Sequence, residues 1–175
     1  MANETYIKLR RLAPADDGGQ ALVEFALSAS LLLTLLFGLI DFSRAIYFEE
    51  LMANLTGEGS SMASRGTSLA KTVAAVVAAS GDLNLGSNGQ VIVSSVLNNS
   101  GKIQLSGQAS QGGIGATSRI GSVINGNASL PAAAAPQANQ TIYVTEVFYK
   151  YQAITPIGNF LSVVLPSQLY DVAYY

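Results

Sequence analysis

A run of sixteen uncharged, mostly apolar residues, Phe25 to Ile40, constrains this chain more than any other feature. A helix from Ala21 to Ile40 would be about 30 Å long at about 1.5 Å per residue, which equals the thickness of the hydrocarbon core of a bilayer. The core helix of a small globular domain would show a polar stripe, whereas Leu31 to Leu36 is interrupted only by Thr34. The run therefore predicts a transmembrane helix, which we place at residues 20–43.

Basic residues flank this run unequally. Three of them precede it closely, at Lys8, Arg10 and Arg11, whereas Arg44 alone follows soon after it. Because cytoplasmic flanks carry the excess of Lys and Arg, we expect a cytoplasmic N-terminus and an exported C-terminal part. A cleaved secretory signal peptide is the alternative. Its apolar region usually has about 7 to 15 residues, and the nearest small-x-small triplet here, at residues 43–45, contains an arginine.

Composition narrows the classes of function. The chain has 175 residues, enough for one modest domain. It contains neither Cys nor His, so disulfides, the common zinc sites and the Ser-His-Asp and Cys-His catalytic arrangements cannot form, and we expect no metal or cofactor. Nine Lys and Arg against eleven Asp and Glu give a net charge of −2, which argues against a nucleic-acid partner. Charged residues make up 11% of the chain and hydrophobic residues 49%, a balance that favours a membrane partner.

A short motif stands immediately before the apolar run. Gly18 and Gly19 are followed by QALVEF at residues 20–25, so Glu24 occupies the fifth position after Gly19. Glycine has no Cβ and lets an extended backbone approach a protease closely. A carboxylate inside lipid costs about 3 kcal/mol or more unless it is paired. Glu24 therefore either needs a partner or lies at headgroup depth and simply ends the span.

This motif resembles the class III signal of type IV pilin-like proteins, which a prepilin peptidase cuts after the glycine on the cytoplasmic face. The string GGQALVEFALSASLLLTLLFGLIDFSRAIYF, residues 18–48, is similar to the N-terminus of TadE-family pseudopilins of the tight-adherence (Tad) machinery. That family shares a G-Q-A-x-V-E-F-A core, then an apolar stretch, an acid and R-A. The matching positions here are Glu24, Phe25, Asp41, Arg44 and Ala45. Beyond residue 48 only the segment 143–151, with Thr-Pro at 155–156, is loosely similar.

The resemblance implies a processing site and an assembly site. The peptidase would cut between Gly19 and Gln20 and remove residues 1–19 as a leader. Glu24 and Phe25 would then act in subunit recognition and assembly, with Glu24 paired to the new α-amino group of an adjoining subunit, which is largely cationic at neutral pH. The plainer alternative is that Glu24 only marks the headgroup boundary.

The resemblance also implies a role and partners. The role is that of a minor pilin or pseudopilin, a structural and non-catalytic subunit of a Tad-type pilus or secretion filament for adhesion. The partners are the prepilin peptidase, other pilin or pseudopilin subunits in a homo- or hetero-oligomer, and the inner-membrane assembly platform. The implied location is the bacterial inner membrane, and an extracellular filament after assembly.

Two other functions stay open at this point. The chain could be a signal-anchored exported module that binds glycan or peptidoglycan, keeps its first nineteen residues and never enters a filament. It could also be an envelope hydrolase that uses Glu146 and Asp171, although only the presence of two carboxylates supports this. Glu49 and Glu50 form an adjacent acid pair, but neighbours on a helix do not face each other, so we expect no acid-base pair there.

Residues 44–80 show helical spacing and predict an amphipathic exported helix that continues the transmembrane helix. Its expected apolar stripe is Tyr47, Leu51, Leu55, Met62, Leu69, Val73 and Val76. Each glycine weakens a helix by about 1 kcal/mol relative to alanine, so Gly57 and Gly59 predict a bend or break near residues 57–59. Ser80-Gly81 predicts the end of the helix.

Residues 81–175 predict a small β-rich head with Gly, Ser and Asn-rich loops, which makes the expected fold α+β with an antiparallel sheet. The resemblance implies that this fold is type IV pilin-like. The expected strands are a hairpin of Val91–Leu97 and Lys102–Ser106 that reverses at residues 98–101, a strong central strand at Gln140–Ile154, and an edge strand at Leu169–Tyr174. Between and after them we expect a flexible loop at Gln108–Gly115, a linker or extended turn at Pro131–Pro136, and a short apolar helix at Pro156–Leu165. The glycine-rich loop lacks the lysine of a phosphate-binding P-loop.

Overall fold

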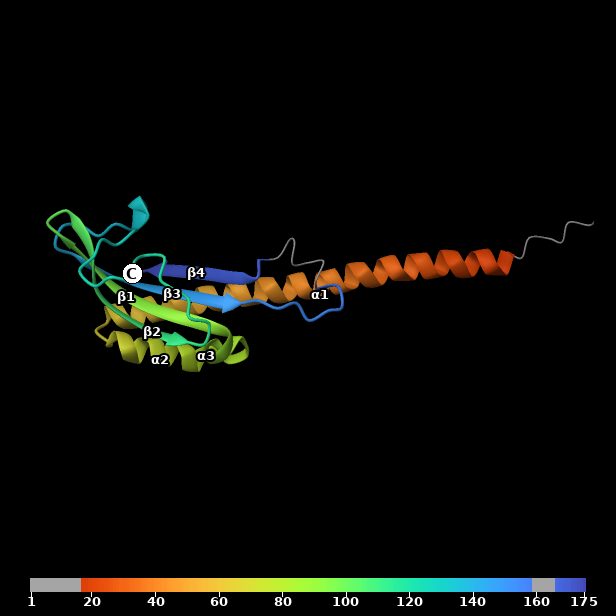
Figure 1. Cartoon of the computed structure of the whole chain (residues 1–175), viewed down its shortest axis with the longest axis horizontal. Helices are drawn as coiled ribbons and strands as arrows, with labels where there is room; N and C mark the ends of the chain where they lie inside the picture. Colours follow the sequence, from red (N-terminus) through yellow and green to blue (C-terminus); the bar gives the residue numbers. More distant parts are fainter. Residues whose placement is uncertain (1–16, 159–165) are drawn as a thin grey trace, which may run out of the picture.

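The computed structural model describes residues 17–158 and 166–175 of the chain. One long helix, α1 (Asp17–Ser64), carries a small head on its C-terminal half and projects alone over its N-terminal half (Figure 1). The head contains the helix α2 (Leu69–Ala79) and a four-stranded antiparallel sheet in the order β2-β1-β3-β4. The strands are β1 (Gly89–Asn99), β2 (Lys102–Gly112), β3 (Thr141–Lys150) and β4 (Gln168–Tyr174). Short helical turns are η1 (Gly81–Leu83), α3 (Leu85–Asn88) and η2 (Ala132–Ala134). The predicted α+β fold is confirmed.

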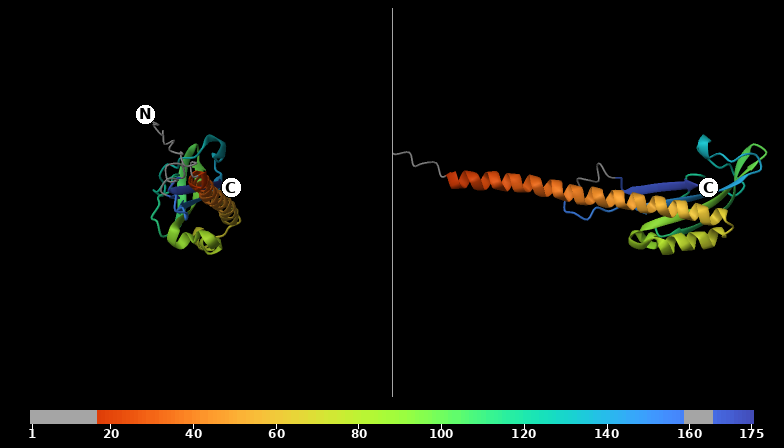
Figure 2. Two further views of the ribbon diagram at one scale, coloured as in Figure 1. Left: turned by 90° about the vertical axis from the view of Figure 1, so that its right-hand side faces the viewer. Right: turned by 180° about the vertical axis from the view of Figure 1, so that it is seen from behind.

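The head has one apolar layer on each face of its sheet. Both helices cover one face, with α2 beside α1 (Figure 2). The larger layer, between this face and the helices, includes Phe48, Met52, Leu55, Val73, Val76, Val91, Val93, Val147, Tyr149 and Leu169. The smaller layer lies under the long connection between β2 and β3 and contains Val96, Leu105, Ile120, Ile142 and Val144. Strand β3 contributes to both layers, as its alternation of apolar residues on two faces predicted.

The predicted apolar stripe of the exported helix is partly wrong in its register. Leu55, Val73 and Val76 are buried as predicted, but Tyr47 is 49% exposed. The residue that follows it, Phe48, takes the buried place. Adjacent residues on a helix lie about 100° apart, so two apolar neighbours compete for one face, and contacts with the sheet decide between them.

Of the bend or break predicted near residues 57–59, the break is wrong, because α1 continues to Ser64 and the chain turns only at residues 65–68. Gly66, with φ of 93°, supplies the left-handed backbone of this turn. Gly59 has a packing role instead. A Cβ on Gly59 would lie 2.9 Å from the side chain of Thr145 and 3.0 Å from that of Val76, so its missing side chain lets α1 approach the sheet closely.

The predicted hairpin is confirmed, with a longer second strand than expected. Ser100 and Gly101 form its two-residue turn with φ of 52° and 95°, the sign that a type I′ turn requires at both positions. Strand β2 continues to Gly112, and residues 108–112 pair with residues 90–94 of β1. The flexible loop predicted at Gln108–Gly115 is therefore wrong for residues 108–112, where the ladder to β1 decides the conformation.

The remaining predicted elements of the head follow the structure closely. β3 is a central strand and β4 an edge strand, as predicted. The predicted strand at Gln140–Ile154 is too long at its C-terminal end, because β3 ends at Lys150. A single turn of 3-10 helix, η2, lies within the turn predicted at Pro131–Pro136. Most of the apolar helix predicted at Pro156–Leu165, namely residues 159–165, lies outside the described residues.

Candidate functional site

The N-terminal half of α1 is an apolar surface that the head leaves uncovered. An 18-residue window of this helix is apolar enough to cross a membrane, and none of it is buried inside the structure. Its large side chains point outward all round the helix; they include Leu22, Phe25, Leu27, Leu31, Leu32, Leu35, Leu36 and Leu39. A soluble monomer rarely exposes a continuous apolar surface of this kind. This half of α1 is therefore consistent with a membrane anchor.

The predicted processing and assembly residues lie together at the free end of α1. Gly19 and Gln20 belong to the first turn of the helix, so their backbone is helical and not extended as we expected. The side-chain amide of Gln20 donates a hydrogen bond of 2.9 Å to Oε1 of Glu24, one turn away. Phe25 is 71% exposed. A protease that reads an extended backbone would have to unwind this first turn, which is the part of a helix that frays most easily.

Asp41 ends the apolar run, and its carboxylate is enclosed where the helix meets the head. The residue has no exposed surface. Its Oδ1 accepts a hydrogen bond of 3.0 Å from the backbone N–H of Ile154, and its Oδ2 accepts one from the hydroxyl of Thr155. The hydroxyl of Tyr151 donates to the backbone carbonyl of Asp41 at 2.8 Å. These three bonds fasten residues 151–158, here called the junction loop, to α1.

Arg44, one turn after Asp41, makes a second connection to the junction loop. Its guanidinium donates to the carbonyl oxygen of Gln152 at 3.0 Å and lies 4.7 Å from the ring centroid of Phe48. Phe48 in turn packs edge-on against Tyr149 and Tyr151. Asp41 and Arg44, two of the positions that carried the family resemblance, therefore both contact the junction loop, although more than a hundred residues separate them from it in the chain.

Burial and charge at this junction act on the two tyrosines. Burial raises the pKa of Tyr149, and the Arg44 guanidinium opposes this shift. Burial also raises the pKa of Tyr151, with a further increase from the nearby Asp41 carboxylate, and Arg44 again opposes it. Both phenols are therefore neutral at physiological pH, and that of Tyr151 donates a hydrogen bond to α1.

Thr56 and Ser60 connect α1 to the sheet, and our sequence reasoning missed both. The hydroxyl of Ser60 donates to the carbonyl of Ala173 at 2.9 Å and accepts from the N–H of Thr145 at 3.0 Å, so it bridges β3 and β4. The hydroxyl of Thr56 donates to Oδ2 of Asp171. The signal that could have indicated this face is the run of small residues at 56, 59, 60 and 63, which repeats at helical spacing beside the apolar stripe.

The carboxylates of the hydrolase hypothesis, Glu146 and Asp171, are not brought together. Glu146 pairs with Val172 and Asp171 pairs with Val147, so the two side chains leave opposite faces of the sheet. Asp171 faces α1, where it meets Thr56. The structure therefore places no pair of catalytic carboxylates at these positions.

Glu146 is fully buried. It holds the connection between β2 and β3 against the outer face of the sheet, which is the face away from α1 and α2. It accepts hydrogen bonds from the hydroxyl of Ser118, from the N–H of Arg119 at 2.8 Å and from the hydroxyl of Tyr170 at 3.1 Å. The guanidinium of Arg119 lies 3.8 Å from the ring centroid of Tyr170. Burial, followed by the charge of Glu146, raises the pKa of Tyr170 well above its ordinary value, while Arg119 opposes the shift.

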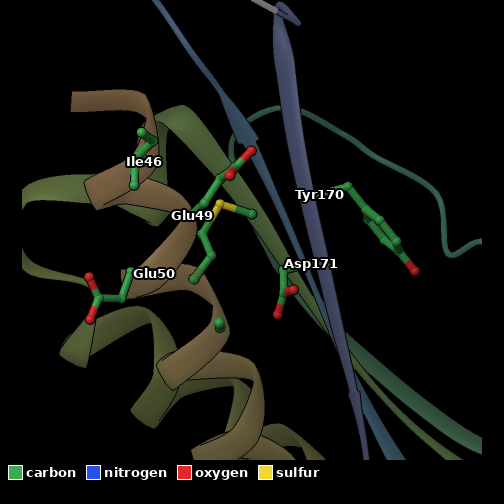
Figure 3. A pocket seen from close by; sticks show the side chains of 7 residues that line it. Ile46, Glu49, Glu50, Tyr170 and Asp171 are labelled. Carbon is green, nitrogen blue, oxygen red and sulfur yellow. The ribbon is translucent and has the colours of Figure 1, made fainter. Parts of the chain in front are cut away.

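A groove of about 520 Å³ lies between α1 and β4 (Figure 3). Its lining residues are Ile46, Glu49, Glu50, Met52, Ala53, Tyr170 and Asp171. Glu49 points toward β4 and Glu50 points away from it, so the two neighbouring acids do not face each other, as the helix geometry predicted. Within residues 17–158 and 166–175, no three acidic side chains come together as a metal ion would require.

A comparison with protein families found a match in the N-terminal part of the chain. Residues 19–60 match the family model described as TadE-like protein. Searches of curated proteins and of solved structures each found no significant match. The matched segment covers the free half of α1, the junction residues Asp41 and Arg44, and Ser60, which bridges the strands. The chain is therefore TadE-like over residues 19–60, as the motif at the start of its apolar run predicted.

Proposed function

We propose that this chain is a minor pilin or pseudopilin, a structural and non-catalytic subunit that assembles with like subunits into a Tad-type pilus or secretion filament. The observation that carries the proposal is the free half of α1, an apolar helix surface that its own head leaves uncovered within a TadE-like segment. In lipid such a surface is solvated by acyl chains, and small residues such as Gly38 allow close approach of neighbouring helices.

The proposed orientation places the N-terminus in the cytoplasm and the head on the exported side of the bacterial inner membrane. The prepilin peptidase then cuts between Gly19 and Gln20, which leaves Gln20 as the first residue of the mature chain. The new α-amino group lies one turn from Glu24, and the same amine on an adjoining subunit would pair with this carboxylate in the assembled bundle. Other pilins and the inner-membrane assembly platform are the remaining proposed partners.

Replacement of Gly19 tests this proposal. We expect the wild-type protein extracted from its native membrane to begin at Gln20, and the Gly19→Leu variant to keep residues 1–19, because a branched side chain at the cut blocks the approach of the peptidase. N-terminal sequencing and intact-mass measurement check both expectations. The Gly38→Leu variant is the matched control, since it makes the same replacement in open space on the same helix and should be cut normally.

Two results would contradict the proposal. Normal cleavage of Gly19→Leu at Gln20 would show that the glycine does not define the cut. A wild-type protein that keeps residues 1–19 in its native membrane would favour the alternative, a signal-anchored exported module that binds glycan or peptidoglycan and does not enter a filament.

A further inference from the structure

Asp41, the acidic residue that ends the apolar run of α1, is not exposed on the surface of the molecule. Asp41 has no exposed surface, because the junction loop encloses its carboxylate and supplies two hydrogen-bond donors. Beside Asp41, the surface of the molecule is therefore formed by outward side chains of the junction loop and not by the Asp41 carboxylate. The acidic residue that ends the apolar run in the sequence does not end the apolar surface of the folded molecule.

The exposed residues of the junction loop are Gln152, Ile154 and Pro156, and the last two are apolar. Ile154, whose N–H binds Asp41, is 64% exposed. Leu39, Ile40 and Phe42 are the exposed apolar residues of α1 on either side of Asp41. Figures 1 and 2 show that the loop leaves β3 and runs beside α1 toward its free half, beyond the sheet. The apolar surface of the free helix thus continues onto the junction loop.

Polar and aromatic groups appear on the next turns of α1, where Ile46 is also exposed. Arg44 lies about 6 Å further along the helix axis than Ile40, at about 1.5 Å per residue. The half-exposed ring of Tyr47 follows, and then the exposed carboxylates of Glu49 and Glu50. An apolar level followed by a basic and aromatic level is the order of groups at a membrane-water interface, where Tyr rings and basic side chains lie among the headgroups.

We propose that the junction loop is an interfacial membrane anchor. Ile154 inserts among the acyl chains of the leaflet on the side of the head, while Arg44 and Tyr47 lie at the level of the headgroups. This inference rests on the membrane-anchor role of α1 proposed above. The occupant is lipid because the loop surface is continuous with the apolar surface of α1.

The anchor would fix how the head sits on the membrane. The loop lies on one side of α1 only, so its insertion sets both the depth of the helix and the face of the head that meets the bilayer. Asp41 acts here as a positioning residue. Its hydrogen bonds hold the loop against the helix and keep a carboxylate, which is costly in lipid, from contact with acyl chains.

Single-tryptophan fluorescence in full-length protein tests the proposal directly, because the chain contains no Trp. The variants are Ile154→Trp, Leu33→Trp within the apolar run, and Val123→Trp, an exposed apolar position in the head. Each is reconstituted in phosphatidylcholine vesicles whose acyl chains carry bromine either near the headgroup or near the bilayer centre. Circular dichroism confirms that each variant is folded.

The three tryptophans should be quenched by different agents. We expect shallow bromines to quench Ile154→Trp more than deep bromines do, and deep bromines to quench Leu33→Trp more than shallow ones. Val123→Trp should be insensitive to bromine and lose its emission to aqueous iodide. This pattern would place the loop in the interface.

Other patterns overturn the inference in distinguishable ways. If Ile154→Trp behaves like Val123→Trp while Leu33→Trp is quenched by deep bromines, the loop is not inserted although α1 is anchored. If Leu33→Trp also escapes bromine, the membrane-anchor role of α1 fails together with the loop. If Ile154→Trp is shielded from bromine and iodide alike, and the shielding depends on the protein-to-lipid ratio, a second copy of the chain covers the loop in place of lipid.

Discussion

Asp41 and Glu146 are the two carboxylates that the described part of the chain buries completely, and both fasten loops. A buried carboxylate is costly unless its oxygens accept hydrogen bonds. Asp41 receives them from the junction loop beside α1, and Glu146 receives them from Ser118, Arg119 and Tyr170 on the outer face of the sheet. At the scale of single residues, these acids hold irregular segments to regular ones.

Removal of the Asp41 side chain should weaken the junction. In Asp41→Ala the N–H of Ile154 and the hydroxyl of Thr155 lose their acceptor in a buried position, so we expect the free energy of unfolding to fall by about 1–3 kcal/mol. Urea unfolding of full-length protein in detergent, followed by circular dichroism, measures the change. Glu50→Ala, which removes an exposed acid from the same helix, should change stability by no more than about 0.5 kcal/mol. Equal effects of the two variants would contradict this role of Asp41.

Tyr170 should make the head sensitive to alkaline pH. Its pKa is raised in the folded state, chiefly by burial, above the value of about 10 expected in the unfolded chain. The stability that this shift contributes is fully present below pH about 10 and is lost as the pH rises through the folded pKa. The free energy of unfolding, measured with urea at successive pH values, should therefore fall above pH about 10, and less steeply in Tyr170→Phe.

Measurements near neutral pH supply the reference for this comparison. Tyr170→Phe also removes the hydrogen bond to Glu146, and that loss shifts stability at every pH. Only the difference between the two proteins in how steeply the free energy of unfolding falls at alkaline pH reports the ionisation of the Tyr170 phenol. Parallel curves for the two proteins would show that Tyr170 does not contribute to the alkaline loss.

At the scale of elements, α1 is one uninterrupted helix whose two glycines near its C-terminal end have different surroundings. A Cβ on Gly59 would meet the stiff, fully buried side chain of Thr145, whereas a Cβ on Gly57 would meet nothing within 4 Å. The same substitution at these two positions therefore separates the effect of packing from the effect of helix propensity.

Alanine at the two glycines should have opposite effects. Gly59→Ala pushes α1 away from the sheet, and we expect a loss of about 1–3 kcal/mol in the free energy of unfolding, as in other overpacked cores. Gly57→Ala removes a flexible residue from a helix interior, and we expect a gain of about 0.5–1 kcal/mol. Urea unfolding midpoints check both values. A loss in both variants, or in neither, would contradict the close approach at Gly59.

The elements that the sequence predicted well are those set by local signals. The hairpin of β1 and β2 follows from its turn residues, and β3 follows from its run of branched and aromatic side chains. One position on the buried face of α1 was misplaced, because Tyr47 and Phe48 are both apolar. The choice between them depends on packing against Tyr149 and Tyr151, which are distant in the chain and which no local pattern reveals.

At the scale of the whole molecule, the candidate site has a part that local sequence signals predict, the free half of α1, and a part that they do not, the contact between α1 and the junction loop. The free helix and its terminal motif were predictable, since length and composition alone determine what can cross a bilayer. The junction was not predictable, because it depends on contacts between α1 and the loop after β3, more than a hundred residues apart. Asp41 and Arg44 were noticed as family-like positions, but their contacts emerged only from the fold.

The continuity of α1 has a mechanical consequence if the protein is pulled by the free half of this helix. The helix has 48 residues, about 72 Å at about 1.5 Å per residue, and its bonds to the head are spread from Asp41 to Ser60. Tension along the helix axis would load these bonds in parallel, in shear. The force would be distributed over all of them, so that they would not break one after another. The helix and the head would then respond to traction as one stiff body.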